Sequence, residues 1–208
     1  MKSKAYIWVK KYLGGLVRFL FRISSYGSEN EPCAEDGPYI VISNHISNLD
    51  PIFICSVMKH QQPHFMAKKE LFKIPLLSSL ITALGAYPVD RGGADVGAIR
   101  KTIRMLEEGK SIGIFPQGHR QRGLDPNATE VKNGIAMIAA RSEKQVLPCF
   151  IRTKKRKFTP FCKVEVIVGK PVKFSELNYN PDALGEYSRI SKLLFERVCE
   201  LEDSCRGE

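Results

Sequence analysis

The chain has 208 residues, of which 43% are hydrophobic and 26% are charged, so its composition is that of an ordinary globular protein and not of a disordered one. This length suits one domain with a substantial core. The 32 Lys and Arg residues against 22 Asp and Glu residues give a net charge of +10, which favours an anionic partner such as nucleic acid, an anionic membrane face or a phosphorylated substrate.

An apolar segment at the start of the chain, residues 4–23, is interrupted repeatedly by charged side chains. It contains no run of the roughly 20 mainly apolar residues that a membrane-spanning helix needs. At helical spacing one narrow face carries the basic residues Lys4, Lys11, Arg18 and Arg22. The opposite face carries the apolar residues Val9, Leu13, Leu16, Leu20 and Ile23. The aromatic residues Trp8, Tyr12 and Phe19 flank the apolar face. This layout favours a helix lying in a membrane interface. A soluble helix packed on its own domain has the same layout.

We therefore expect residues 1–25 to form an amphipathic interfacial helix, or a helix pair broken at Gly14-Gly15, and residues 26–208 to form the globular domain. The domain is expected to begin with a polar linker, residues 25–37. After it, apolar runs and helical periodicity alternate. The expected strands are 39–43, 64–67, 87–89, 111–115, 145–151 and 163–168, and the expected helices are 51–59, 69–84, 95–108, 133–142 and 182–201.

This alternation of strands and helices predicts an α/β domain with a mainly parallel sheet flanked by helices. Ligands of such sheets bind beyond the carboxyl ends of the strands. The loops that follow strands 39–43 and 111–115 are therefore the places to look for a site. In the last helix, the side chains expected to face the core are Leu184, Tyr187, Ile190, Leu194 and Leu201.

The six cysteines are scattered, with neither CxxC pairs nor the spacing of a zinc site. Because no secretory signal is recognisable, we expect reduced thiols in a cytoplasmic setting. Cys55 and Cys149 lie in apolar stretches and are expected to pack as small hydrophobic side chains. We assign the cysteines no chemical role and expect neither a metal nor a cofactor.

His45 and Asp50 lie in the loop after strand 39–43. Histidine titrates near neutral pH, and beside a carboxylate it can act as a general base on a hydroxyl. We expect direct transfer without a covalent enzyme intermediate. The sequence Asp50-Pro51 also predicts a helix start, with Asp50 as N-cap and Pro51 at the first helical position. The alternative is that Asp50 only caps this helix and that His45 is an ordinary polar loop residue.

Basic residues accompany three other turns. In the loop after strand 111–115, Pro116 and Gly118 predict a tight turn, and Arg120 can hold a phosphate in a bidentate fork. Arg91 follows strand 87–89, and Lys132 precedes a helix whose amino terminus suits an anion. Each has a simpler alternative, an ordinary turn or a surface charge. The basic run 152–157 is expected to be a solvated loop, with contact to anionic lipid as the alternative.

Taken in order, these blocks resemble the glycerophospholipid acyltransferases typified by 1-acylglycerol-3-phosphate acyltransferase. The first block is the Asn-His-x4-Asp-Pro motif of residues 44–51; the second is 68–71 with Pro75 and 85–91; the third is Phe115-Pro116-x-Gly118-x-Arg120; the fourth is 146–148. The resemblance covers about residues 38–170. In the third block, Gln117 and His119 stand where the family usually has Glu and Thr.

The resemblance implies that the chain transfers a fatty acyl group from a thioester to the sn-2 hydroxyl of 1-acylglycerol 3-phosphate, making phosphatidic acid. His45 would be the general base and Asp50 would orient its ring. The substrate-binding residues implied by the blocks are Arg91, Gln117, Gly118, His119, Arg120 and Lys132. The altered third block leaves a different acceptor open, such as glycerol 3-phosphate or another lysolipid.

The same resemblance implies an acyl-CoA or acyl carrier protein as donor and a location on the cytoplasmic face of the cell membrane. There the enzyme would be a peripheral or monotopic protein in contact with anionic lipid. A basic membrane- or nucleic-acid-binding module without catalysis is the alternative from another class. We expect no nucleic-acid partner, because the chain lacks an aromatic and basic recognition motif of the RNA-binding kind.

Overall fold

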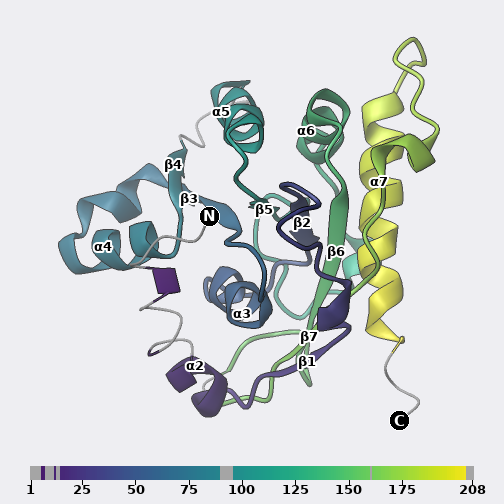
Figure 1. Ribbon diagram of the computed structural model, residues 1–208. Coiled ribbons are helices and arrows are strands. Elements are labelled where there is room, and N and C mark those ends of the chain that lie inside the picture. The colour runs from purple at the N-terminus through teal and green to yellow at the C-terminus, as the bar shows by residue number, and fades with distance from the viewer. Residues whose placement is uncertain (1–5, 8–11, 13–14, 90–95, 160, 205–208) are drawn as a thin grey trace.

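A computed structural model gives the fold, and it describes residues 6–7, 12, 15–89, 96–159 and 161–204. Within these residues, seven strands form one sheet in the order β1-β7-β6-β2-β5-β3-β4 (Figure 1). The strands are β1 (Ser24–Tyr26), β2 (Ile40–Ser43), β3 (His64–Lys68), β4 (Tyr87–Val89), β5 (Ile112–Ile114), β6 (Val146–Arg152) and β7 (Glu165–Val168). The helices are α2 (Gly15–Leu20), α3 (Asp50–Val57), α4 (Pro75–Ala83), α5 (Val96–Glu107), α6 (Gly134–Ser142) and α7 (Glu186–Cys199).

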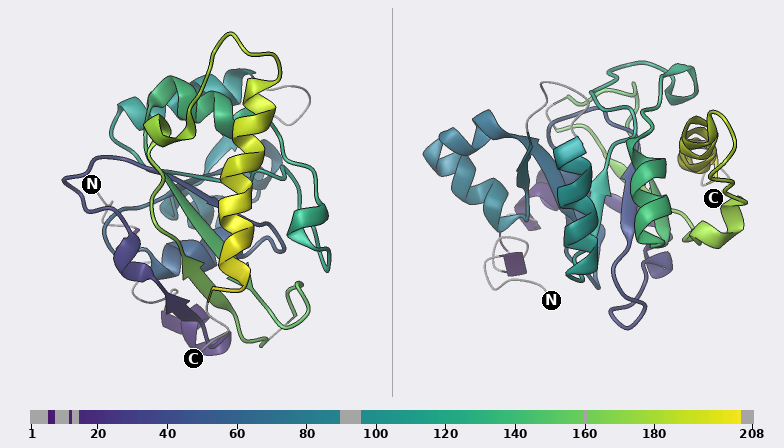
Figure 2. Two further views of the ribbon diagram at one scale, coloured as in Figure 1. Left: turned by 90° about the vertical axis from the view of Figure 1, so that its right-hand side faces the viewer. Right: turned by 90° about the horizontal axis from the view of Figure 1, so that it is seen from above.

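The sheet is mainly parallel, since in the described part of the chain only the pair β6–β7 is antiparallel. All four residues of β2 are buried, which is expected of a central strand covered on both faces. Ile40 and Ile42 face a core shared with α5, α6 and α7, whereas Val41 faces a second core shared with α2 and α3 (Figures 1 and 2). The predicted α/β class, with helices flanking a mainly parallel sheet, is confirmed.

The predicted linker 25–37 is wrong at its start, because Ser24–Tyr26 forms β1 and pairs in parallel with β7. This edge strand has only three residues, two of them serines, so it carries no apolar alternation that a sequence pattern could reveal. The strand forms because β7 pairs with β6 on one side only and leaves the backbone groups of its other side open to β1. The short helix α2 precedes it, with Val17 buried and Phe19 80% exposed, and Ile23, between α2 and β1, is buried.

The last helix is shorter than predicted, Glu186–Cys199 instead of 182–201. Gly185, with φ 77°, precedes its first turn. Leu184 therefore lies outside the helix and is fully exposed, so its predicted core position is wrong, whereas Ile190 and Leu194 are buried as expected.

The packing of two cysteines agrees with expectation. Cys55 and Cys149 are buried. Gly109, with φ 78°, follows the last turn of α5. None of the helices described here is long and apolar enough to cross a membrane.

Part of the predicted lead helix lies outside the described residues. This applies to Lys4, Trp8, Val9, Lys11 and Leu13, and it applies also to the predicted site residue Arg91.

Candidate active site

The two loops singled out from the sequence lie next to each other. Strands β2 and β5 are parallel neighbours, with Ile42 opposite Ile114, so the chain leaves both at the same edge of the sheet. The backbone amide of Gln121 donates to the carbonyl oxygen of His45 at 2.7 Å, which ties the second loop directly to the first. The first and third sequence blocks therefore meet at the carboxyl edge of the sheet, although His45 and Gln117 are 72 positions apart in the sequence.

His45 and Asp50 form a buried pair at this edge. His45 Nδ1 lies 2.7 Å from Asp50 Oδ2, and the two side chains are 11% and 0% exposed. The same Oδ2 accepts hydrogen bonds from the backbone amides of Ile46 at 2.7 Å and Ser47 at 2.8 Å. Burial raises the pKa of the Asp50 carboxyl, while the hydrogen bonds from His45 and the two amides oppose that shift. These contacts hold the imidazole with Nδ1 toward the carboxylate.

Asp50 is the first residue of α3 and not its N-cap, a position taken by Leu49. The prediction of Asp50 as N-cap is thus wrong by one residue. Instead of capping the helix, its carboxylate turns back to the loop that carries His45. Ser47, between the two, is buried, and its Oγ accepts a hydrogen bond from the Leu49 amide at 3.1 Å.

Aromatic rings fix the plane of the His45 imidazole. The ring of Phe115 stacks on it with centroids 4.1 Å apart and planes 13° apart, and Phe65 stacks on Phe115 at 5.4 Å. Gly113 makes room for this stack, since a Cβ at that position would lie 2.1 Å from the Phe65 ring. With Nδ1 engaged by Asp50, Nε2 is the ring nitrogen left without a hydrogen-bond partner among the described residues.

Replacing Gly113 with alanine should therefore disturb catalysis through the stack. We expect a loss of about 1–3 kcal/mol in the free energy of unfolding, because the new methyl group forces Phe65 to move, together with a lower kcat. Urea unfolding and initial rates measure the two effects. Gly134→Ala is the matched control, because a Cβ there meets nothing within 4 Å. Unchanged stability and rate in Gly113→Ala would refute the positioning role of the stack.

Gln117 is 1% exposed and both ends of its amide are engaged inside the protein. Its Oε1 accepts from the backbone amide of His45 at 2.8 Å, and its Nε2 donates to Thr129 Oγ1 at 2.7 Å. The Thr129 hydroxyl in turn donates to the carbonyl oxygen of Pro126 at 2.7 Å. Gln117 thus connects the His45 loop to the segment that leads to α6.

This network suits an amide and not a carboxylate at position 117, because one end of the side chain accepts a hydrogen bond and the other donates one. A Gln117→Glu variant would place a carboxylate opposite a hydroxyl whose hydrogen is already donated to Pro126. We expect it to lose about 1–3 kcal/mol of unfolding free energy at pH 7. Burial raises a carboxyl pKa, so the penalty should shrink as the pH falls and the carboxyl becomes protonated. Thermal unfolding at pH 7 and pH 5 tests this, and equal stability to the parent at pH 7 would contradict it.

The remaining predicted site residues line the same turn and face solvent. Gly118 has φ 74°, a backbone conformation that favours glycine, and a Cβ there would lie 3.2 Å from Lys132 Cγ. His119 is exposed, with Nε2 2.8 Å from Gln121 Nε2. The side chains of Arg120 and Lys132 are exposed and form no ion pair within the described residues. Arg120 follows Gly118 by two residues, and the Lys132 amide donates to the carbonyl oxygen of Pro116 at 2.8 Å, so both cations belong to the surroundings of this turn.

Comparison with known proteins agrees with this geometry. The family model described as Acyltransferase matches residues 22–152, which is more than half of the chain. The chain belongs to the acyltransferase family. The resemblance read from the four sequence blocks is confirmed.

Individual relatives carry a more specific name. The 1-acyl-sn-glycerol-3-phosphate acyltransferase of Bacillus subtilis is 27% identical to this acyltransferase over 183 residues, which cover 87% of this chain and 88% of the relative. The enzyme of the same name from Streptococcus pneumoniae is 32% identical over 142 residues, which cover 66% of this chain and 52% of the relative. The crystal structure of the 1-acyl-sn-glycerophosphate acyltransferase PlsC from Thermotoga maritima is 24% identical and has a TM-score of 0.66, covering 98% of this chain and 84% of that one. The last comparison shows a shared fold.

Sequence reasoning missed the residues of this acyltransferase that hold the site together. The Asn44 amide pairs with both backbone groups of Ile151 in β6, at 3.0 and 2.7 Å, and so anchors the His45 loop to the sheet. Phe65 and Thr129 act through their contacts with Phe115 and Gln117. The position of Asn44 beside His45 was a usable signal, but nothing local marks Phe65 or Thr129, whose partners are distant in sequence.

Proposed function

We propose that this acyltransferase moves a fatty acyl group from a thioester to the sn-2 hydroxyl of 1-acylglycerol 3-phosphate. The product is phosphatidic acid, an intermediate of phospholipid biosynthesis. The observation that carries the proposal is the buried His45–Asp50 pair, which leaves Nε2 as the available base. The names of the Bacillus and Streptococcus relatives support the same acceptor.

In the reaction, His45 Nε2 takes the proton of the acceptor hydroxyl while the oxygen attacks the thioester carbonyl carbon. Asp50 stabilises the imidazolium that forms and keeps its ring in place. When the carbon–sulfur bond breaks, the imidazolium returns its proton to the leaving thiolate. Direct transfer of this kind needs no covalent enzyme intermediate.

The oxyanion of the tetrahedral intermediate needs hydrogen-bond donors. The amides of His45 and Gly118 donate within the protein, to Gln117 Oε1 and to the carbonyl oxygen of Phe115. In contrast, the backbone amides of His119 and Arg120 have no hydrogen-bond partner within the described chain. We assign the oxyanion to these two amides. The next amide in the chain, that of Gln121, donates to the carbonyl oxygen of His45, so both amides are close to the histidine along the chain.

Arg120 and Lys132 bind the phosphate of the acceptor in this proposal. Both are exposed and unpaired in the described structure, and Gly118 allows the chain to approach closely between them. Arg91, which lies outside the described residues, is proposed as a further phosphate ligand on the strength of the second block alone. Gln117 acts by positioning His45, and His119 borders the acceptor site.

The donor is proposed to be an acyl-CoA or an acyl carrier protein. We further propose that, of the predicted interfacial segment 1–25, the part before β1 is interfacial. The acyltransferase domain then comprises β1 and residues 26–208, and the enzyme is peripheral on the cytoplasmic face of the cell membrane. Phe19, 80% exposed on α2, supports contact with lipid.

An acceptor panel tests the proposal. Purified protein is incubated with one acyl thioester and with 1-acylglycerol 3-phosphate, glycerol 3-phosphate or 1-acylglycerophosphocholine, and the products are identified by mass. We expect phosphatidic acid to be the main product. Transfer to glycerol 3-phosphate alone would overturn the acceptor, and nucleic-acid binding without any transfer would overturn the enzyme.

A further inference from the structure

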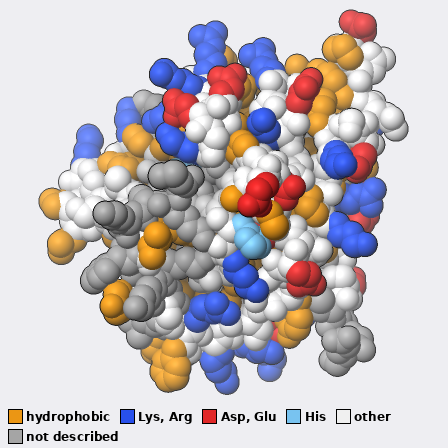
Figure 3. All heavy atoms as spheres, in the orientation of Figure 1, with side chains coloured by type: hydrophobic (Ala, Val, Ile, Leu, Met, Phe, Trp, Pro, Cys, Tyr) orange, Lys and Arg blue, Asp and Glu red, His pale blue; other side chains and the backbone are white. Residues whose placement is uncertain are grey.

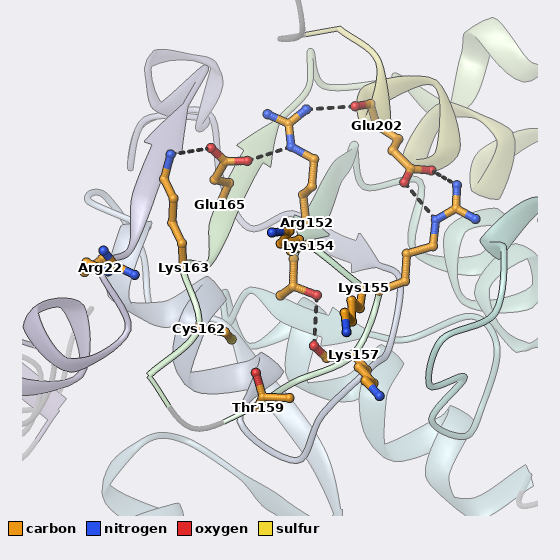
Figure 4. Close-up of a pocket in the computed structure, with 12 residues that line it drawn as sticks. Arg22, Arg152, Lys154, Lys155, Lys157, Thr159, Cys162, Lys163, Glu165 and Glu202 are labelled. Carbon is orange, nitrogen blue, oxygen red and sulfur yellow. Dashed lines mark hydrogen bonds and ion pairs between the residues drawn. The ribbon is translucent and has the colours of Figure 1, made fainter.

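A basic cavity of about 920 Å³ is lined mainly by the segment that joins β6 to β7 (Figure 4). It shares no lining residue with the acceptor site proposed above. The cavity is lined by Arg22, Arg152, Thr153, Lys154, Lys155, Arg156, Lys157, Thr159, Cys162, Lys163, Glu165 and Glu202. Seven basic side chains therefore face two carboxylates.

Some of these cations are held by the carboxylates and others are not. Glu165 accepts from Arg152 at 2.7 Å and pairs with Lys163 at 2.9 Å, and Glu202 holds Arg156 by two hydrogen bonds of 2.9 and 3.0 Å (Figure 4). The unpaired basic residues are Arg22, Lys154, Lys155 and Lys157, for which no ion pair is found in the described structure. The cavity thus carries a surplus of positive charge that nothing in the described chain neutralises.

Hydrogen bonds within the protein hold the loop that carries these lysines. The amide of Arg156 donates to the carbonyl oxygen of Thr153 at 3.2 Å, which closes a turn with Lys154 and Lys155 at its corner. Arg156 has φ 49°, and its carbonyl oxygen accepts from Gly123 at 2.8 Å. The side chain of Arg156 is held by Glu202 as well, so both its backbone and its side chain anchor the turn that carries the lysines.

Two exposed aromatic side chains lie close in sequence to residues that line the cavity, Phe161 before Cys162 and Phe19 three residues before Arg22. Phe161, next to the lining residue Cys162, is 67% exposed, and Phe19 is 80% exposed on α2. The two segments are joined beneath the surface, where Phe158 contacts Phe21 and Phe53 at ring-centroid distances of 5.2 and 5.9 Å. Blue basic and orange apolar side chains lie together along the lower edge of the face seen in Figure 3.

We propose that the basic cavity binds the phosphate headgroup of an anionic phospholipid in the bilayer, with Phe161 and Phe19 entering the membrane interface beside it. Unpaired lysines attract an anionic surface, and aromatic rings are favoured at the headgroup level. A soluble phosphate ligand would account for the lysines but would give the exposed rings no role. The inference rests on the proposed function in one respect, that a lipid acceptor requires the enzyme to work at a membrane.

Vesicle binding tests this inference. The full chain is compared with a triple variant, Lys154→Gln, Lys155→Gln and Lys157→Gln, by co-sedimentation with phosphatidylcholine vesicles that contain or lack phosphatidylglycerol. The matched control is Lys170→Gln, Lys173→Gln and Lys192→Gln, which removes the same charge from exposed positions outside the cavity.

We expect the triple variant to bind phosphatidylglycerol vesicles on the order of 100-fold more weakly, as three lysines near an anionic surface would imply. The control should lose less than about 3-fold, because β7 runs antiparallel to β6 and Lys170 and Lys173 follow its end away from the cavity, where screening by salt weakens attraction to the surface. A Phe161→Ser variant should bind both kinds of vesicle more weakly. Equal loss in the triple variant and the control would overturn the inference.

Two further readouts separate the possible failures. If the triple variant keeps vesicle binding but loses affinity for coenzyme A in equilibrium dialysis, the cavity binds the phosphates of the donor and the inference is wrong. If vesicle binding falls as expected while the parent protein transfers no acyl group in detergent micelles, the inference stands and the proposed function fails.

Discussion

Replacing His45 with alanine should lower kcat for acyl transfer to 1-acylglycerol 3-phosphate by about 10²- to 10⁴-fold, the usual contribution of a positioned general base. The affinity for the acceptor should change little, because the phosphate is assigned to Arg120 and Lys132. Initial rates with a saturating acyl thioester measure the effect.

His60→Ala is the matched control for this variant, because His60 is exposed and its hydrogen bond to Glu31 is made by the backbone amide, which the alanine keeps. It should keep the parental rate. The fold of His45→Ala is checked by thermal unfolding, since the alanine also removes a ring that stacks on Phe115. A correctly folded His45→Ala protein with parental kcat would exclude the mechanism.

Replacing Asp50 with asparagine should lower kcat by a comparable factor, about 10²- to 10⁴-fold. The amide has nearly the shape of the carboxylate, and its oxygen can still accept from Ile46, Ser47 and His45. What is lost is the negative charge that stabilises the imidazolium in a fully buried position.

The second carboxylate oxygen makes this substitution informative. Asp50 Oδ1 is buried and has no hydrogen-bond partner in the described structure. An asparagine can place its NH₂ group there and keep the geometry of the loop, so the thermal midpoint should fall by only a few degrees. Asp182→Asn, at an exposed position, serves as the control. Parental activity in Asp50→Asn would show that Asp50 is a structural residue.

The central strands and helices were predictable because short stretches of the sequence carry their hydrophobic patterns. β2 and β6 are apolar runs buried on both faces, and α5 has a clear apolar stripe. The edge strand β1 and the position of Leu184 were not predictable. The first depends on pairing with β7, and the second depends on where the chain turns before α7.

For the site, the amino-acid sequence by itself determined which groups are available: a histidine and an aspartate in one loop, and a Pro-x-Gly-x-Arg turn after another strand. Spacing along the chain was enough for this, because parallel strands deliver their loops to one edge. Only the tertiary structure decided that His45 and Asp50 touch, and that Gln117 positions His45 from within the protein. Those contacts depend on partners such as Thr129 and Phe65, which the fold brings close and which no local pattern connects.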